Sequence, residues 1–202
     1  MHGAGDNDAM PFAFYDRLSA PRQRTYRRSD AIVELVLPQG PDPRPAAEAI
    51  ALALRAEREA SVQRACQGLL DDLTSRFRVP WLRARVYAVR PSGDWGELHG
   101  MYFPLEDGAA ARIELWMRTA MRARVVAPRT FLRTLVHEFC HHLDYEHFGL
   151  PETFHTEGFY KRESHLLNQI AGPPQPRRRP SVQSGADTTD TGTRGASAHS
   201  NS

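Results

Sequence analysis

The chain has 202 residues, of which 41% are hydrophobic and 25% charged, and its formal net charge is +2. This length suits one domain with a buried core, and no apolar stretch approaches the roughly 20 residues that a membrane span needs. So small a net charge does not give the strong basic field of a dedicated nucleic-acid binder. Cys66 and Cys140 make neither a disulfide framework nor a zinc ribbon, and residues 1–10 lack the apolar run of a secretory signal. We therefore expect a cytoplasmic protein.

Composition divides the chain into three parts. Residues 1–44 alternate aromatic and arginine side chains, which predicts a loosely attached N-terminal arm that packs its aromatic rings on the core. A short strand is expected within it, at residues 31–37. Residues 45–170 carry the regular apolar spacing of a folded domain. Residues 171–202 are rich in proline, serine, threonine and glycine and contain no aromatic residue, which predicts a disordered tail.

The predicted elements of the domain follow one another without an internal repeat. A helix should start with Asp42 as its N-cap and Pro43 at its first position, because apolar residues then recur at intervals of three and four as far as Phe77. It should end before Val79 and Pro80. Three strands are predicted at residues 81–89, 97–103 and 112–118, with short turns that favour antiparallel neighbours. Two helices follow, at residues 129–148 and 156–170. This order indicates an α+β fold with one long N-terminal helix and a small, mainly antiparallel sheet.

Histidines are concentrated near the end of this domain, with six of the nine between residues 137 and 165. His137, Glu138 and His141 form an H-E-x-x-H motif on the first of the two final helices. A spacing of four places both imidazoles on one helical face, as zinc binding by two nitrogens requires. Glu138 lies beside the first ligand, where it can act as a general base on a metal-activated water.

A catalytic zinc needs a third protein ligand and an open position. His155 is preferred, because it follows the helix break at residues 150–151 and precedes the next helix, where a returning chain can point back at the metal. Glu163 is the alternative third ligand, since a glutamate from a second helix is also common. Asp144 follows His141 by one turn and is expected to orient the other ring nitrogen of a ligand. The remaining downstream residues of ligand type are His147, Glu157 and His165.

The segment HEFCHHLDYEHFGLPETFHTEGFYKRES, residues 137–164, resembles the core of the SprT-like zincin metallopeptidases. His155 and Phe159 match the H-x-x-x-F step of that family. The resemblance implies a zincin-like domain with one catalytic Zn²⁺ held by His137, His141 and His155, and with Glu138 catalytic. Many members carry a cysteine-rich zinc ribbon after this helix. This chain has none, so it is similar to a minimal bacterial member.

The expected function is that of a zinc-dependent metallopeptidase acting on a protein or peptide substrate. Tyr160, Arg162 or His165 is expected to donate to the tetrahedral oxyanion or to support a metal ligand from behind, and the sequence does not choose among them; His165 and His142 are expected to be supporting or surface groups. Residues 112–118 are expected to line the cleft and to pair with an extended peptide. One alternative is a nucleic-acid-associated protein recruited through the six arginines between residues 112 and 133. Another is a non-catalytic zinc-binding protein, which would have no need of Glu138.

Overall fold

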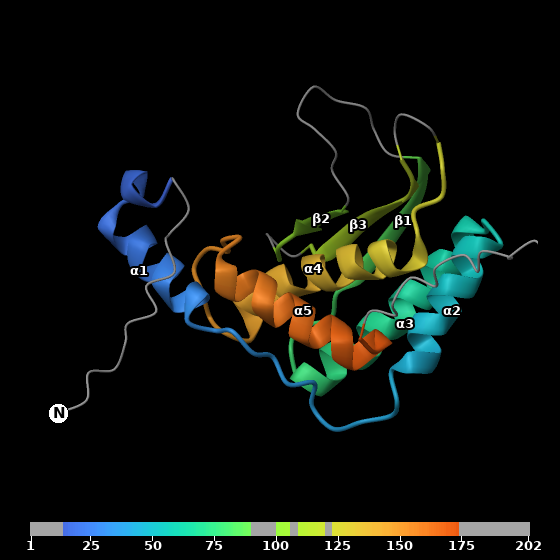
Figure 1. Ribbon diagram of the computed structural model, residues 1–202, viewed down its shortest axis with the longest axis horizontal. Coiled ribbons are helices and arrows are strands. Elements are labelled where there is room, and N and C mark those ends of the chain that lie inside the picture. Colours follow the sequence, from blue (N-terminus) through green and yellow to red (C-terminus); the bar gives the residue numbers. More distant parts are fainter. Residues whose placement is uncertain (1–13, 90–99, 106–108, 120–122, 174–202) are drawn as a thin grey trace, which may run out of the picture.

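The computed structural model describes residues 14–89, 100–105, 109–119 and 123–173 (Figure 1). Most of the predicted tail and residues 97–99 of the second predicted strand lie outside these ranges. In chain order the elements are η1 (Tyr15–Arg17), α1 (Ala20–Asp30), α2 (Arg44–Arg55), α3 (Glu59–Phe77), β1 (Arg83–Val89), β2 (Gly100–Phe103), β3 (Arg112–Arg118), α4 (Pro128–Glu146) and α5 (Glu157–Ala171). The α+β class is confirmed. Within the described ranges, no helix combines the length and the apolarity that crossing a membrane requires.

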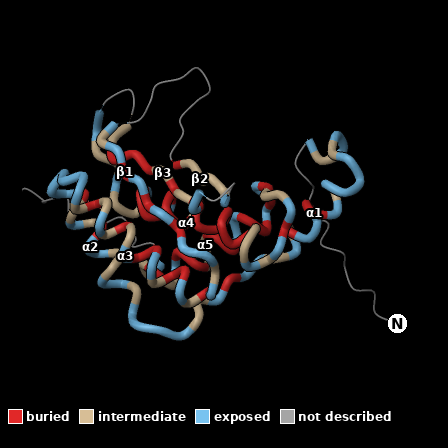
Figure 2. Tube along the Cα trace, turned by 180° about the vertical axis from the view of Figure 1, so that it is seen from behind, coloured by how far each residue is buried: buried red, intermediate tan, exposed pale blue. Residues whose placement is uncertain are grey.

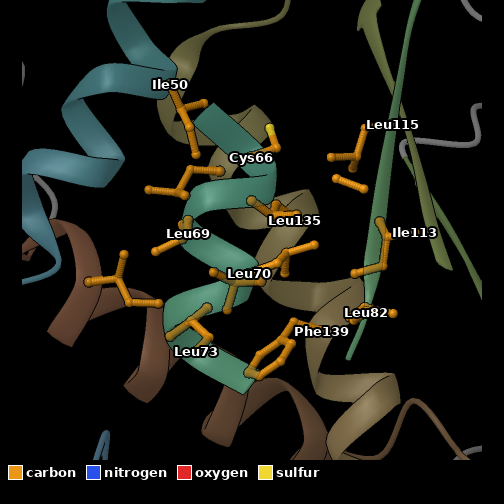
Figure 3. Packing of buried hydrophobic residues seen from close by; sticks show 14 of the residues in the cluster. Ile50, Cys66, Leu69, Leu70, Leu73, Leu82, Ile113, Leu115, Leu135 and Phe139 are labelled. Carbon is orange, nitrogen blue, oxygen red and sulfur yellow. The ribbon is translucent and has the colours of Figure 1, made fainter. Parts of the chain in front are cut away.

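Helix α4 lies at the centre of the molecule. It contacts strands β2 and β3 on one side and α5 on the other, and α2 also packs against it (Figure 1). Buried residues gather where these helices, α3 and the sheet meet (Figure 2). In that core Leu135 and Phe139 of α4 face Leu69 and Leu70 of α3 beside the strand residue Ile113 (Figure 3). Since the H-E-x-x-H motif is on α4, the core fixes it from several directions.

The sheet is mixed, with strand order β1-β3-β2, and this corrects the expectation of mainly antiparallel neighbours. β1 pairs with β3 in parallel, with Val86 opposite Leu115, and β2 pairs with β3 antiparallel, with Tyr102 opposite Ile113. Strand β3 therefore lies between β1 and β2. Its alternate side chains belong to the core that α3 and α4 also form. Alternation within each strand predicts which face is buried but not the order of the strands.

The single long helix predicted before the sheet is wrong, because the chain turns between α2 and α3. The turn is a helix C-terminal motif in which Glu57 takes φ of 54°. Its amide donates to the carbonyl of Leu54, and the amide of Arg58 donates to the carbonyl of Ala53. Glycine usually occupies this left-handed position. With a glutamate there, the sequence has no residue that marks the end of the helix. The turn lets α2 and α3 pack on one another, which a straight helix of about 50 Å would prevent.

The outer edge of β1 is covered by two glutamines of α3. Gln63 donates to the carbonyl of Ala84 at 2.6 Å and accepts from the amide of Val86 at 2.8 Å. Gln67 donates to the carbonyl of Leu82 at 3.0 Å and accepts from the amide of Ala84 at 2.8 Å. The two side-chain amides thus take the place of a neighbouring strand.

The described part of the N-terminal arm is fastened to α5 more closely than its composition indicates. Residues 31–37 form no strand, which corrects that prediction. Side chains of α5 bond this backbone instead: the amide of Leu35 donates to Nδ1 of His165, and Gln169 accepts from the amide of Leu37. Leu35 also joins the main core. Of the arm's aromatic rings, that of Tyr26 is buried as expected, whereas Phe14 is 43% exposed.

Candidate metal centre

Two adjacent pieces of chain bring three histidines together. Helix α4 begins with Pro128 at its first turn and buries a broad apolar face, which leaves His137 and His141 on the side toward α5. The chain then turns, and α5 begins after Thr156, whose Oγ1 accepts from the amide of Phe159 at 3.0 Å. This cap fixes the entry of α5 and places His155 against the other two rings.

The three Nε2 atoms form a small triangle. His137 and His155 are 2.9 Å apart at Nε2, His141 and His155 are 3.1 Å apart, and His137 and His141 are 3.2 Å apart. A tetrahedral zinc with metal–nitrogen bonds of about 2.0–2.1 Å would separate its ligands by about 3.3 Å. The triangle therefore has the size and the donor chemistry of a three-histidine zinc site.

The other ring nitrogen of His137 is bonded by a buried carboxylate. Nδ1 lies 2.9 Å from Oε2 of Glu163, whose residue is 2% exposed. Oε1 of the same carboxylate forms an ion pair with Arg133 at 3.2 Å. Because Nδ1 of His137 donates a hydrogen bond to Glu163, the lone pair of the ring is on Nε2 and points into the triangle. Glu163, the alternative third ligand of the sequence, thus supports a ligand in this structure and does not take its place.

His141 is held by a longer chain of bonds. Its Nδ1 lies 2.8 Å from Oγ1 of Thr153, which donates its only hydroxyl proton to Oδ2 of Asp144 at 2.6 Å. Nδ1 must therefore be the donor, so Nε2 of His141 also carries a lone pair. Arg162 donates to Oδ1 of Asp144 at 2.6 Å, and both of these side chains are fully buried. Two lone pairs directed at each other at 3.2 Å repel unless a cation lies between them, which favours a metal at this point.

Burial disfavours protonation of these rings. It lowers the pKa of His141 to about 2, with His137 and His155 adding to the shift. Burial also lowers the pKa of His155. Neutral imidazoles are the form that binds metal, so near pH 7 these two ligands need lose no proton.

Glu138 lies in the wall of the same site and is 6% exposed. Burial raises the pKa of its carboxyl to about 7, against the opposing effects of His137 and of a hydrogen bond from the backbone of Tyr102. Gly100 of β2 comes so close that a Cβ there would be 2.9 Å from Oε1 of Glu138 and 2.7 Å from Cγ2 of Thr134. The sheet and α4 together fix this carboxylate.

A cavity of about 720 Å³ opens in front of the histidines and Glu138. Of the three oxyanion donors left open by the sequence, only Tyr160 lines it, with its ring stacked on His155 at 5.9 Å. Arg162 is buried behind the site, where it bonds Asp144 and takes the supporting role that was the other expectation for it, and His165 bonds the N-terminal arm. The other downstream residues of ligand type also lie elsewhere, since His147 packs on Phe77 and Glu157 pairs with Lys161.

Sequence reasoning missed several residues of the site. Thr153 carried no signal, because a threonine in a turn has many uses. Gly100 was detectable, since a glycine inside a predicted strand indicates a close approach by another group. Tyr102 was assigned only to a strand. Its hydroxyl lies 3.0 Å from Nδ1 of His142, whose Nε2 lies 3.0 Å from the carbonyl of Pro80.

Four of the six arginines between residues 112 and 133 lie on two elements, and Arg124 is exposed in the loop between them. Arg112 and Arg118 lie at opposite ends of β3, where they pair with Glu114 and Glu57. Arg129 and Arg133 lie on α4, where they bond the carbonyl of Gly172 and the carboxylate of Glu163. Arg122 is outside the described residues. Four guanidinium groups of the set thus bond other groups of this chain.

Comparison with known proteins identifies no relative: no family model, no curated protein and no solved structure matches the chain. The chemistry of the site itself therefore has to indicate the function.

Proposed function

We propose that this protein is a zinc-dependent metallopeptidase. The observation that supports the proposal is the convergence of three histidine Nε2 atoms within 3.2 Å of one another, in a cavity that also contains the buried carboxylate of Glu138. A purely structural zinc site has no use for this carboxylate, and closed structural sites do not open onto a cavity of substrate size. The resemblance of the motif favours the SprT-like zincins within this class.

The chain's own groups have distinct tasks in this reaction. Zinc, when bound by His137, His141 and His155, would polarise the scissile carbonyl and lower the pKa of a water. Glu138 accepts a proton from the attacking water and passes it to the leaving amine. The carboxylate of Glu138 lies in the wall of the cavity beside the ligand His137, where it can reach a water on the metal.

Tyr160 is the chain's best candidate to stabilise the oxyanion. Its side chain is 43% exposed, lines the cavity and stacks on His155. Burial and the charge of Glu163 raise the pKa of its hydroxyl, which therefore stays protonated and can donate a hydrogen bond.

The substrate strand is expected at β2. Residues 112–118 were expected to pair with the substrate, but β3 is the central strand and both its edges are paired. The glutamines of α3 cover β1, whereas Gly100, Met101 and Tyr102 of β2 line the cavity. An extended peptide that adds to the outer edge of β2 would run past Glu138 and the histidines.

The two alternatives stay predictions of the sequence. Recruitment by nucleic acid draws no support from the arginines of residues 112–133, whose described members mostly bond groups of this chain. A non-catalytic zinc protein would share the triangle of histidines and differ only in the use of Glu138.

Metal analysis and one substitution separate these possibilities. The protein, purified after expression with added zinc, should contain about one zinc per chain and should cleave an unfolded protein such as casein. Glu138→Gln should retain zinc and lose activity by at least about a hundredfold, since the amide cannot accept a proton. Glu157→Gln, an exposed glutamate on α5, is the matched control. A zinc content near zero would refute the proposal, and an active Glu138→Gln would refute the role of this carboxylate.

The third ligand has its own test. His155→Ala should abolish stoichiometric zinc binding, because two imidazoles hold zinc weakly. Glu163→Ala should weaken zinc binding by about 10–100-fold, the usual effect of losing a partner of a metal ligand. The reverse order would make Glu163 the ligand.

A further inference from the structure

The N-terminal arm contacts the metal centre from behind. Arg162 of α5 is fully buried, and its guanidinium donates to the carbonyl of Ser29 at 2.8 Å, to Oγ of Ser29 at 3.0 Å and to the carbonyl of Ile32 at 3.2 Å. These acceptors lie at the C-terminal end of α1, where helix carbonyls lack partners within the helix. The same guanidinium bonds Asp144 and, through Thr153, supports the ring of His141.

The arm also holds the segment that carries Thr153 and His155. The buried ring of Tyr26 packs on Phe154, with centroids 5.7 Å apart. The guanidinium carbon of Arg22 lies 5.5 Å from the centroid of the Phe154 ring, and its Nε and Nη2 donate to the two carboxylate oxygens of Glu152, Nε at 2.7 Å. Residues 152 and 154, on either side of Thr153, are thus both in contact with α1.

The contact between α1 and α5 is so close that it requires a glycine. Oδ1 of Asp30 accepts from the amide of Gly158 at 2.8 Å. A Cβ on Gly158 would lie 2.1 Å from the carbonyl oxygen of Asp30, a distance at which the two helices must separate. Gly158 therefore allows the arm to dock at the entry of α5, three residues after His155.

From these contacts we propose that the N-terminal arm is a working part of the metal centre: docking of α1 fixes Arg162, Thr153 and His155, and so sets the affinity for zinc. Arg162, Asp144 and Thr153 are positioning residues, because they act through His141 and do not reach the metal. The inference rests on the proposed zinc site. Since coupling between two equilibria is reciprocal, zinc must in turn hold the arm on the domain.

Zinc affinity of full-length variants tests the first half of this coupling. Gly158→Ala should weaken zinc binding, measured by competition with a chromophoric chelator, by about tenfold or more, the range found when the partner of a metal ligand is lost. Gly68→Ala is the matched control, because Gly68 has no atom within 4 Å of the added Cβ. Tyr26→Ala, which loosens the arm from its own side, should weaken zinc binding to a similar degree.

Thr153 provides the test that separates positioning from general stability. Thr153→Val keeps the shape of the side chain but cuts the bonds to His141 and Asp144, so it should weaken zinc binding by about 10–100-fold. Thr153→Ser keeps the hydroxyl and should bind zinc like the wild type. Equal affinities for the valine and serine variants would refute the relay through Thr153.

Hydrogen exchange of the backbone amides of α1 tests the reciprocal half on the wild-type protein. Zinc should slow this exchange relative to chelator-treated protein, and the effect should shrink in Thr153→Val. If the wild type binds zinc through its three histidines while exchange in α1 is the same with and without the metal, the coupling is wrong and the proposed function stands. If the wild type binds no zinc, the proposed function itself fails.

Discussion

At Glu138 the needs of the reaction oppose those of stability. The carboxyl is 6% exposed and its pKa is raised from 4.5 to about 7. A raised carboxyl pKa means that the folded state binds the proton more tightly, so this stabilisation is present below pH 4.5 and is lost as the pH rises through 7. Near pH 8 the metal-free protein therefore carries a buried charge that costs on the order of 3 kcal/mol.

This cost predicts a pH-dependent gain on substitution. Glu138→Gln should raise the free energy of unfolding of chelator-treated protein by up to about 3 kcal/mol at pH 8, and by much less at pH 5. Urea unfolding at the two pH values measures both gains. Glu157→Gln should show no such difference. An equal gain at both values would mean that the carboxyl of Glu138 titrates at its ordinary pKa.

At Gly100 the site has no room for a Cβ atom. A methyl group there would press on Thr134 and on the carboxylate of Glu138. We expect Gly100→Ala to lower kcat by up to about a hundredfold through displacement of the base, because a shift of about 1 Å can have that effect. Zinc content should stay at one per chain, since no ligand is touched. Kinetics and metal analysis of Gly100→Ala and Gly68→Ala decide the point, and an unchanged kcat would show that the strand can yield.

Residues of the site differ in how far the sequence can predict them. His137, Glu138 and His141 follow from helical spacing alone, because four residues make one turn. The prediction of His155 as the third ligand depended on a reversal of the chain after α4, and proline and glycine locate such a reversal only to within a few residues. Arg162 and Tyr160 are two residues apart on α5, and only packing decides that one is buried beneath the site and the other lines the cavity. Spacing carries no information on which face of a second helix meets the first.

At the scale of elements, the errors have a common cause. The break between α2 and α3 is made by Glu57 in a conformation that glycine prefers, so local propensity predicted a continuous helix. The strand order β1-β3-β2 likewise depends on a connection across the sheet that no local pattern encodes. Strand β1 was predicted well because its buried and exposed residues alternate regularly. Strand order and helix ends were predicted poorly because contacts between distant parts of the chain decide them.

The covered edge of β1 leads to a prediction about association. Gln63 and Gln67 satisfy four backbone groups that would otherwise be open to another strand. Gln63→Ala with Gln67→Ala should therefore expose an edge that pairs with a second copy or aggregates. Light scattering and gel filtration should detect larger species in the double variant. Arg64→Ala, an exposed change on the same helix, should remain like the wild type, and a monodisperse double variant would show that the edge is protected by other means.

At the scale of the whole molecule, buried histidines make the metal-free protein sensitive to acid. His142 is fully buried between Tyr102 and the carbonyl of Pro80, and burial lowers its pKa from 6.5. His141 behaves in the same way. A histidine whose pKa is lowered stays neutral in the folded state while the unfolded chain takes up a proton. Stability is thus lost as the pH falls below about 6.5, and each such histidine contributes at most about 1.4 kcal/mol per pH unit.

Glu138 partly masks this loss, because its effect has the opposite sign between pH 4.5 and 7. The slope of stability with pH in the wild type is therefore a difference of opposing contributions, and a single substitution is needed to isolate one of them. In His142→Gln the amide retains polar atoms near Tyr102 and Pro80 but takes up no proton on unfolding. We expect its stability, measured by urea unfolding in chelator, to fall less steeply than that of the wild type below pH 6.5. The wild type should therefore have the steeper slope in this range. Parallel slopes would mean that His142 is protonated in the folded state, with the hydroxyl of Tyr102 accepting a hydrogen bond from Nδ1 in place of donating one.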